Sequence, residues 1–379
     1  MIANTTAGLD GIATTGSGRR RRPRVALRLG VTLCAALCAA AIISLEPATA
    51  ASRATAAASK ITIAFDQGYC GNGWRITEND ALFAEAKQLE QAGQLASYKY
   101  LCASGSVTTQ ESQMADLVIE HPSVIIVDPQ SGTALNGVIA KAYAVHIPVL
   151  VLDAGPVTST LPYELNADNP DRIFAIGQYL ANRLHGVGNI FEDRGIAGNL
   201  AEADYHAALL AAFKPYPKIH IVKSVWGDWT DSVSEEATAA VISALPTINA
   251  VVCQEGCYGV LEAFKAAGRP VPLINGDNEG YFVKWWSSEY KATGYTTISL
   301  QTNPGIGGAG MYVADQIARG EPVPKYMYMP LLPITAATLS QFSYLPDNAT
   351  TASKTYSNSW YQANIIDKPV SAKSYETIP

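Results

Sequence analysis

The sequence lacks the common catalytic signatures, and histidine, the usual acid–base residue, is scarce. The 379 residues include five histidines, which do not cluster: His121, His146, His185, His206 and His220. The chain contains no G-x-S-x-G nucleophile motif, no phosphate-binding P-loop and no H-E-x-x-H zinc motif. These absences argue against the common serine hydrolases, nucleotide hydrolases and zinc peptidases.

Charged residues are also few, at 16% of the chain, and arginines gather near the N-terminus. An RRRRPR run (19–24) precedes an apolar stretch (25–45) and a small-residue A-T-A site that ends at Ala50. This succession predicts a signal peptide over residues 1–50, cleaved after Ala50. An uncleaved membrane anchor is the alternative, although the uninterrupted apolar part, about 17 residues, is at the short edge for a span.

Removal of this segment leaves an acidic chain. Six arginines, Asp10 and Glu46 leave with it, so 21 of 27 basic and 31 of 33 acidic residues remain, for a net charge of −10. Such a charge repels phosphate backbones and excludes nucleic acid as a natural partner. Residues 51–59 are small and polar and predict a disordered leader. We therefore expect an exported protein, periplasmic or at the cell surface.

Cysteine is rare as well. Two of the six cysteines lie in the predicted signal peptide, and the mature chain keeps Cys70, Cys102, Cys253 and Cys257. An even number in an exported chain indicates disulfides, although four cysteines allow three pairings. A zinc site fits less well, because the C-x3-C spacing differs from the common C-x2-C pair and no histidine lies near Cys253. We expect no metal and no other cofactor.

Beyond residue 60, short apolar runs alternate with amphipathic segments. Strands are expected over 61–65, 97–103, 123–128, 147–153, 188–192, 219–225, 248–254, 270–277 and 295–301. Helices are expected over 79–93, 108–121, 134–146, 171–186, 202–214, 234–245, 257–268 and 308–320. Unbroken apolar strands between such helices are typical of parallel sheets covered on both faces. The pattern predicts an α/β fold of two doubly wound units, each with a sheet of about six strands.

Ligands bind such sheets outside the carboxyl ends of the strands. Four loops at these ends carry notable side chains: GYCGNGWR (68–75), WGDWTD (226–231), CQEGC (253–257) and NGDNEGYF (275–282). The glycines of the first loop allow a close backbone approach. Trp74 and Trp229 are therefore expected to face a cleft from opposite units, where aromatic rings suit the C–H faces of a sugar.

Several segments, taken in order, carry a family resemblance: IIVDPQSGTALNGVIAKAYAVHIPVLVLD (125–153), DNPDRIFAIGQYLA (168–181), RGIAG (194–198), AVVCQEG (250–256), NGDNEG (275–280) and SLQTNPGIGGAG (299–310). Over most of residues 60–335 the chain resembles the type I periplasmic sugar-binding proteins of ABC importers, typified by ribose-binding protein. The resemblance implies two lobes joined by a three-crossing hinge, near Ala167–Asp168, Gln301 and Lys325–Met327. The N-terminal lobe would comprise 60–167 plus 302–326, the C-terminal lobe 168–301 plus 327–339, and residues 340–379 a tail wrapping one lobe.

The resemblance also implies the sugar-contacting positions: Asn72, Trp74, Arg75, Asp153, Trp229, Glu255, Asp277 and Gln301. Three positions depart from the family pattern. Ala154 stands where the family often carries an arginine, Ala203 or Tyr205 stands at another arginine position, and Glu255 replaces an Asn or Asp. Two guanidinium groups are thus lost, so specificity for ribose itself is not expected.

Other interpretations of these residues remain open. The two tryptophans can be ordinary core residues, and Asp153 and Asp277 can cap helices. Trp226 is as well explained by packing. GIGGAG (305–310) is a literal G-x-G-x-x-G, but the segment after it lacks the strand and acidic residue of a dinucleotide site. We interpret it as a helix start packed tightly at the hinge.

The resemblance implies an extracytoplasmic substrate-binding protein that captures a monosaccharide or related polyol and delivers it to an ABC permease. It would act as a monomer, with ligand contacts from both lobes favouring a closed form. A second hypothesis is a sensor module that docks on a signalling receptor. The least favoured is an exported glycoside hydrolase using Asp153, Glu255 or Asp277 as an acid–base pair.

Free-thiol counting on the denatured, unreduced mature protein should give zero. Cys70 and Cys102 follow the first two strands, which are neighbours in a doubly wound sheet, and Cys253 and Cys257 straddle one strand-to-helix turn. We expect each pair to meet the Cα separation of about 4.4–6.8 Å that a disulfide needs. A count of four free thiols would contradict both pairings.

Overall fold

The computed structural model describes residues 60–153, 157–167 and 169–367. The predicted signal peptide (1–50) and leader (51–59) lie outside the described residues, as does the end of the predicted tail (368–379). Within the described part of the chain, no helix combines the length and hydropathy needed to cross a membrane.

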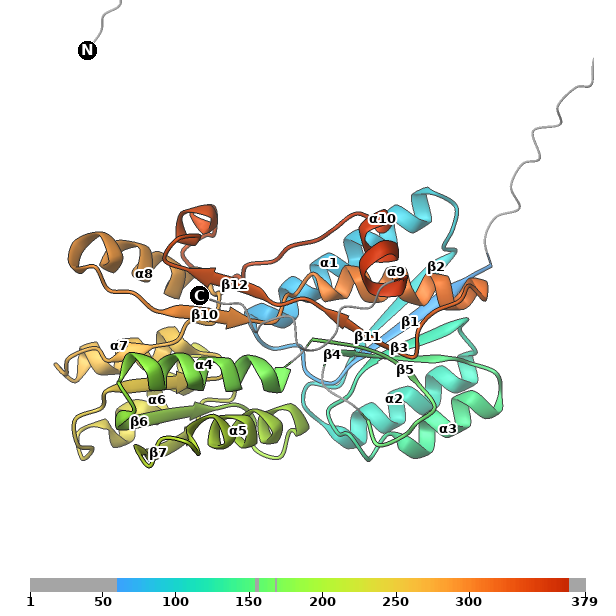
Figure 1. Ribbon diagram of the computed structural model, residues 1–379. Helices are drawn as coiled ribbons and strands as arrows, with labels where there is room; N and C mark the ends of the chain where they lie inside the picture. The colour runs from blue at the N-terminus through green and yellow to red at the C-terminus, as the bar shows by residue number, and fades with distance from the viewer. Residues whose placement is uncertain (1–59, 154–156, 168, 368–379) are drawn as a thin grey trace, which may run out of the picture. The chain divides into compact units, whose positions relative to one another are not determined.

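A six-stranded sheet forms the first lobe (Figure 1), and every strand pair in it is parallel. Its strand order is β11-β5-β4-β3-β1-β2. The bounds are β1 (Thr62–Gln67), β2 (Ser97–Cys102), β3 (Val124–Asp128), β4 (Val149–Asp153), β5 (Tyr163–Ala167) and β11 (Tyr326–Met329). All five residues of β3 and of β4 are buried, because helices cover both faces of the sheet.

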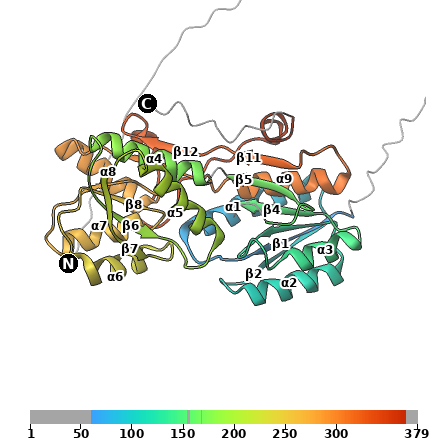
Figure 2. The same cartoon turned by 60° about the horizontal axis from the view of Figure 1, so that its bottom comes forward.

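The helices of the first lobe are α1 (Gly73–Gln91), α2 (Val107–Glu120), α3 (Asn136–Ala144) and α9 (Ile306–Arg319). On one face, Leu82 and Leu89 of α1 share a buried cluster with Met311 of α9. On the other, Met114 of α2 and Ile139 of α3 pack in a second cluster. Figure 2 shows the sheet between these two helix layers.

The second lobe contains a smaller parallel sheet than the sequence pattern predicts. Four strands pair in the order β7-β6-β8-β9, and an antiparallel pair, β10-β12, lies beside them through a bridge between Gly276 and Ser299. The bounds are β6 (Val187–Arg194), β7 (Lys218–Trp226), β8 (Ala250–Cys253), β9 (Leu273–Ile274), β10 (Ile298–Gln301) and β12 (Leu332–Thr335). The expected six-strand parallel sheet is therefore wrong in detail, since β12 returns antiparallel to β10.

The helices of the second lobe are α4 (Asn169–Arg183), α5 (Leu200–Phe213), α6 (Asp231–Ile242), α7 (Cys257–Ala266) and α8 (Gly280–Thr293). Side chains of α4 and α5 pack on one face of the sheet, and those of α6, α7 and α8 on the other. The sequence pattern did not predict α8. Its fully buried residues, Phe282, Val283 and Trp286, show helical spacing, but aromatic side chains on both faces obscure the periodicity.

The chain passes between the lobes at element ends. β5 ends at Ala167 in the first sheet and α4 begins at Asn169 in the second lobe; β10 ends at Gln301, and α9 returns the chain to the first lobe. The passage expected at Lys325–Met327 lies later. β11 pairs with β5 through Met329, so the chain leaves the first sheet only at 330–331, before β12.

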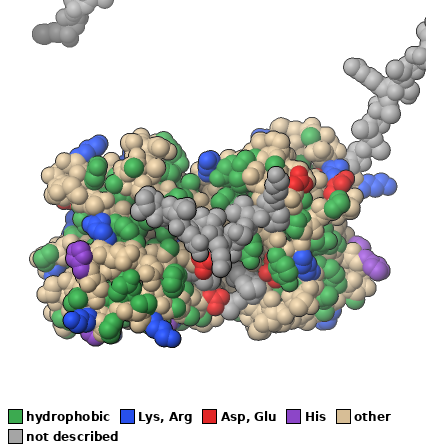
Figure 3. All heavy atoms as spheres, in the orientation of Figure 1, with side chains coloured by type: hydrophobic (Ala, Val, Ile, Leu, Met, Phe, Trp, Pro, Cys, Tyr) green, Lys and Arg blue, Asp and Glu red, His purple; other side chains and the backbone are tan. Residues whose placement is uncertain are grey.

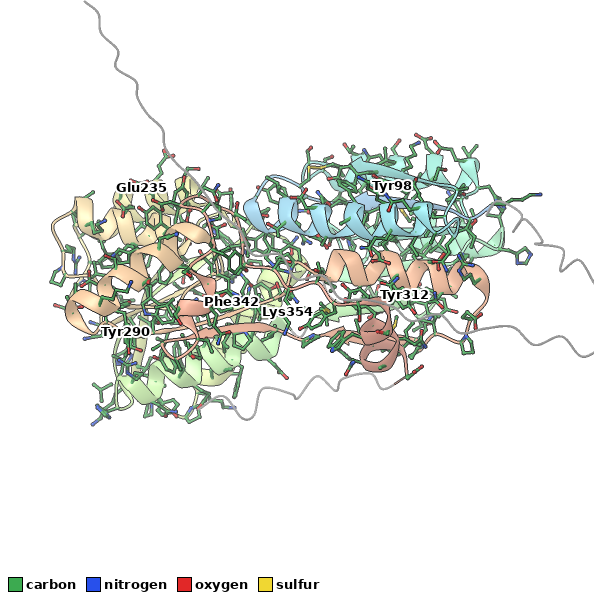
Figure 4. All side chains as sticks on the ribbon, turned by 90° about the horizontal axis from the view of Figure 1, so that it is seen from above. Tyr98, Glu235, Tyr290, Tyr312, Phe342 and Lys354 are labelled. Carbon is green, nitrogen blue, oxygen red and sulfur yellow. A yellow bond between two sulfur atoms is a disulfide. The ribbon has the colours of Figure 1, made fainter. Side chains whose placement is uncertain are left out.

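The tail contacts both lobes rather than one. Phe342, at the end of the 3-10 helix η1 (Leu339–Phe342), and Ala352 are buried in the core of the second lobe. Tyr361, at the junction of α10 (Asn358–Tyr361) and the π-helical turn η2 (Gln362–Ile366), is buried in the core of the first. Figure 4 labels Phe342 and Lys354 along this path, and Tyr312 of α9, whose hydroxyl donates to Gln362. The tail is thus a fourth covalent connection between the lobes.

Backbone hydrogen bonds hold the tail against the start of α8 and the hinge. Gly280 N donates to Thr350 O, and Tyr281 N donates to Asn348 O, each at 3.0 Å. At the hinge, Asn303 Nδ2 donates to Lys354 O at 2.8 Å. A Cβ atom at Gly73, the first residue of α1, would lie only 1.8 Å from the carbonyl oxygen of Ala349. Glycine at position 73 therefore lets the tail cross the opening loop of the first lobe.

On the face drawn in Figure 3, basic and acidic side chains are scattered among hydrophobic and polar ones. Neither sign gathers into an extended patch on that face.

A Gly73→Ala substitution should destabilise the protein by about 1–3 kcal/mol, because the added methyl group must displace the Ala349 backbone. The measurement is the free energy of unfolding in urea. Gly137→Ala in α3 is the matched control, since a Cβ there meets no atom within 4 Å. The control should be neutral or slightly stabilising, as alanine favours helices over glycine. Equal effects of the two substitutions would contradict the close tail contact.

Candidate functional site

A cavity of about 40 Å³ lies where the two lobes meet. Side chains from both lobes and from the hinge line it. They are Asn72, Trp74, Arg75 and Asp153 of the first lobe, Arg172, Asn199, Ala201, Tyr205, Trp229 and Glu255 of the second, and Gln301 and Thr302 of the hinge. Its walls combine carboxylates, guanidinium groups, amides and aromatic rings, which can donate to, accept from and stack against a polar ligand.

Seven of the eight sequence-predicted ligand residues line this cavity, and Asp277 does not. The Asp277 carboxylate accepts hydrogen bonds from Cys257 N at 2.7 Å and from Glu279 N at 3.2 Å. It thereby binds the first amide of α7, which is the helix-capping role that competed with ligand contact. The position of an aspartate at a strand end therefore does not show by itself whether its side chain contacts a ligand or caps a helix.

Arg75 is the electrostatic centre of the first-lobe side of the cavity. Its Nη1 atom lies 2.6 Å from Asp128 and 3.0 Å from both Glu78 and Asp153. Burial disfavours the charged guanidinium, but the three acids overcome this effect and raise the pKa of Arg75 well above its ordinary value. The guanidinium is therefore a fixed positive charge.

The topology of the first sheet explains this cluster. In the order β4-β3-β1, the carboxyl ends of the three strands lie side by side, and Asp153, Asp128 and Gln67 are their last residues. Helix α1 starts at the same edge, where Asn72 caps it by accepting from Arg75 N at 2.9 Å. Because Arg75 lies in the first turn of α1, its side chain meets the acids at the strand ends.

Both predicted tryptophans line the cavity but are more buried than an open cleft would leave them. Trp74 is 4% exposed and Trp229 is 8% exposed, and each belongs to a hydrophobic core cluster. Their indole nitrogens donate within the protein, to Thr302 O and to Gln254 Oε1, each at 3.2 Å. This burial agrees with the alternative that the two tryptophans are core residues, and stacking on a ligand stays a prediction.

The remaining tryptophan of the second loop lies outside the cavity. Trp226 is 42% exposed, and the guanidinium carbon of Arg194 lies 4.3 Å from its ring centre.

Direct contacts join the two lobes at the cavity. Asn72 Nδ2 of the first lobe donates to Trp229 O at 3.4 Å and to Glu255 Oε2 at 3.3 Å in the second.

Two cavity residues adopt left-handed backbone conformations, with φ of 59° at Asp153 and 57° at Trp229. Such strain in non-glycine residues is common at ligand sites, where the surrounding structure enforces it.

Glu255 is held largely protonated at neutral pH. Burial, reinforced by Asp277, raises its pKa to about 8, while Arg172 and Arg75 oppose the shift. Its Oε1 atom has no hydrogen-bond partner among the described residues. Glu255 can therefore donate a hydrogen bond to a ligand oxygen.

Arg172 is the main site residue that sequence reasoning missed. It is 3% exposed and donates to Leu300 O and Gln254 O, each at 3.3 Å, with its guanidinium carbon 4.6 Å from the ring centre of Tyr205. It supplies from α4 a guanidinium group in a site where two family arginines are absent. No local signal marks it, because only the packing of α4 brings it to the cavity. Asn199 and Ala201 at the start of α5 and Thr302 next to Gln301 were also missed, and Tyr205 was considered only as the replacement of a family arginine.

The four cysteines of the mature chain form two disulfides. Cys70 bonds Cys102 with a Cα separation of 6.3 Å, and Cys253 bonds Cys257 with a Cα separation of 5.6 Å. Both expected pairings are present. The first ties the opening loop to the end of β2, since Gln67 and Cys102 are in register.

A second acidic cluster lies beside the cavity, where α6, α7 and α8 begin. One carboxylate oxygen from each of Asp231, Asp277 and Glu279 lies within 4.8 Å of the others. Asp231 accepts from Gly259 N at 3.1 Å, and Asp277 accepts from two amides. Three helix N-termini therefore supply positive partial charge to this cluster.

Residues 63–322 match the family model described as a periplasmic binding protein domain. The chain belongs to the periplasmic binding proteins of type I. The α/β architecture of two doubly wound sheets is the architecture of this class, and the expected family and fold are confirmed.

Relatives of this periplasmic binding protein are known. It is 29% identical to the xylitol-binding protein of Mycolicibacterium smegmatis over 58% of this chain and 63% of that protein, a little less than two thirds of its length. It is 25% identical to a ribose import binding protein of Haemophilus influenzae over 71% of this chain and 89% of that one. A solved ABC transporter solute binding protein from Thermobispora bispora is 26% identical, with a TM-score of 0.75, over 80% and 94% of the two chains.

The ligand-free protein should be more stable near pH 5 than near pH 8. The folded-state pKa of Glu255, about 8, lies above its ordinary value of 4.5. Between these two pH values the folded protein keeps a proton on Glu255 that the unfolded chain releases. This contribution is complete below about pH 4.5 and is lost as the pH rises to about 8. Burial also raises the pKa of Asp66 to about 7, and it raises the pKa of Glu78 to about 7 although Arg75 opposes this shift. Both shifts favour higher stability at low pH, as the shift of Glu255 does.

Glu255→Gln should therefore reduce, without abolishing, the fall of the melting temperature between about pH 5 and pH 8. The control is Glu111→Gln, at an exposed position of α2. It should leave the slope unchanged. A wild-type melting temperature that rises over this range would contradict the assignment of raised pKa values.

Proposed function

We propose that this protein is an exported binding protein that captures a monosaccharide or related polyol between its lobes and delivers it to an ABC permease. It acts without a cofactor and as a monomer, and it is not an enzyme. The names of its relatives support this proposal, since they include a xylitol-binding, a ribose import binding and a galactofuranose-binding protein.

The observation that carries the proposal is the composition of the cavity. Arg75 and Asp153 of the first lobe face Arg172 and Glu255 of the second, and Gln301 lies at the hinge. Each hydroxyl of a sugar both donates and accepts, so neighbouring carboxyl and guanidinium groups can satisfy it fully. Buried polar groups arranged in this way reject ligands that lack the matching hydroxyls.

Binding follows a shift between open and closed lobes. Among the described residues, the direct hydrogen bonds from Asn72 to the second lobe are long, at 3.3 and 3.4 Å, so this contact favours the closed form weakly. A ligand that bonds Asp153 on one side and Arg172 on the other adds contacts that exist only when the lobes are closed. Its differential affinity therefore shifts the population toward the form that a permease can recognise.

A hydrolase function finds less support. A glycosidase needs two carboxyl groups free to act on one bond. Asp153 lies against the Arg75 guanidinium at 3.0 Å, and Asp277 caps α7 outside the cavity. Glu255 is the carboxyl group that has an unpartnered oxygen at the cavity.

The proposal is tested by a thermal-shift panel of pentoses, hexoses, inositols and acyclic polyols. A true ligand at 100 times its Kd should add about 2.7 kcal/mol to the free energy of unfolding. Arg172→Gln should raise the Kd of the best ligand at least about tenfold, since it removes a buried charged donor. Arg183→Gln, on the exposed part of the same helix, should leave the Kd unchanged.

A panel in which no sugar or polyol shifts the melting temperature would contradict the proposed function. Equal effects of the two arginine substitutions on Kd would contradict the role of Arg172.

A further inference from the structure

A crevice of about 610 Å³ adjoins the cavity and shares two of its wall residues, Asn72 and Trp229. Its other walls come from four segments: the first two turns of α1, the starts of α6 and α8, and tail residues 348–350. The two spaces are therefore neighbours that share part of their walls. We call them the inner cavity and the outer crevice.

The outer crevice is large enough to hold a sugar ring in the structure as it stands. Ligand sites are commonly about 300–1,000 Å³, and the outer crevice falls in this range while the inner cavity, at about 40 Å³, does not. Asn72 separates them through hydrogen bonds of 3.3 and 3.4 Å, which are weak. The same side chain caps α1, because Asn72 Oδ1 accepts from Arg75 N at 2.9 Å, so joining the two spaces also requires this cap to move.

The chemistry of the outer crevice suits a sugar ring. Thr77 and Asp80 of α1 and Ser232 of α6 offer hydroxyl and carboxylate groups. Tyr281 of α8 presents an aromatic side chain held by stacking on Tyr258, with ring centres 4.9 Å apart. Aromatic rings pack against the C–H faces of sugars, while polar groups bond the ring edge.

The tail completes the outer crevice. Residues 348–350 form one wall, and their position is fixed by the hydrogen bonds to Gly280 N and Tyr281 N and by close packing on Gly73. The tail thus builds a surface that the two lobes alone do not provide.

A comparable crevice of about 500 Å³ on another side of the inner cavity lacks these features. It shares only Asn199 with the inner cavity, and among the described residues no aromatic side chain lines it. Both crevices have acidic walls, from Glu202 and Asp204 here and from Asp80, Asp231 and Glu279 in the outer crevice. This second crevice provides a matched control of similar size.

Building on the proposed function, we infer that the outer crevice is a subsite for a second sugar ring, so that the protein binds disaccharides or other glycosides of its monosaccharide more tightly than the monosaccharide alone. One ring occupies the inner cavity between Arg75 and Arg172. The linked ring passes Asn72 and Trp229 and lies between Tyr281 and the tail.

The experiment compares each sugar with its own disaccharide by calorimetry: xylose with xylobiose, galactose with galactobiose and arabinose with arabinobiose. At least one disaccharide should bind about tenfold or more tightly than its monosaccharide, which corresponds to about 1.4 kcal/mol. Ser232→Trp fills the outer crevice from an exposed position on α6. This substitution should remove the tighter binding of the disaccharide. It should change the Kd of the monosaccharide less than about threefold.

Thr133→Trp fills the second crevice and should preserve the preference for the disaccharide. Asp80→Trp is a second filling variant from exposed α1, in case Ser232→Trp melts early. Monosaccharides that bind as tightly as their disaccharides, or equal effects of the two crevice substitutions, would overturn the subsite and leave the proposed function standing. Failure of every sugar and disaccharide to bind would overturn both.

Discussion

The ion cluster around Arg75 is the constraint on which the site depends. A single guanidinium lies within 3.0 Å of three buried carboxylates, and Asp66 adds a fourth buried acid nearby. Burying charge costs several kcal/mol per ion, and the guanidinium offsets part of this cost for Glu78, Asp128 and Asp153. The cluster fixes the positions of the Asp153 and Arg75 side chains. Both groups are then ready to bond a ligand without rearrangement, which lowers the entropy lost on binding.

The second lobe presents its groups differently. Arg172 relies on backbone carbonyls and the Tyr205 ring rather than on an ion pair among the described residues, and burial keeps Glu255 largely protonated. One lobe therefore carries a rigid charge cluster, and the other carries groups with unused hydrogen-bonding capacity. A ligand that joins them supplies the contacts that the lobes lack, which is the physical basis for closure around it.

The tail extends the usual two-lobe arrangement. It buries Phe342 and Ala352 in one core and Tyr361 and Ile365 in the other, so it limits how far the lobes can separate. Its backbone also passes close to Gly73 and Gly280, where side chains would collide with it. The same segment therefore connects the lobes mechanically and supplies a wall of the outer crevice.

Local pattern in the sequence determined much of the fold: the apolar runs of β1, β3 and β4, their intervening helices and the cysteine pairs. The family resemblance, rather than local pattern, located seven cavity residues. Predictions of the ligand edge succeed because the carboxyl ends of parallel strands meet at one edge of the sheet. This arrangement does not depend on how individual side chains pack. Tertiary structure alone decided what depends on contacts between distant segments. The pairing of β11 with β5 moved the last hinge passage, the packing of α4 brought Arg172 to the cavity, and the amides of Cys257 and Glu279 made Asp277 a helix cap. The tail has no periodicity of its own, because its buried residues face two different cores in turn.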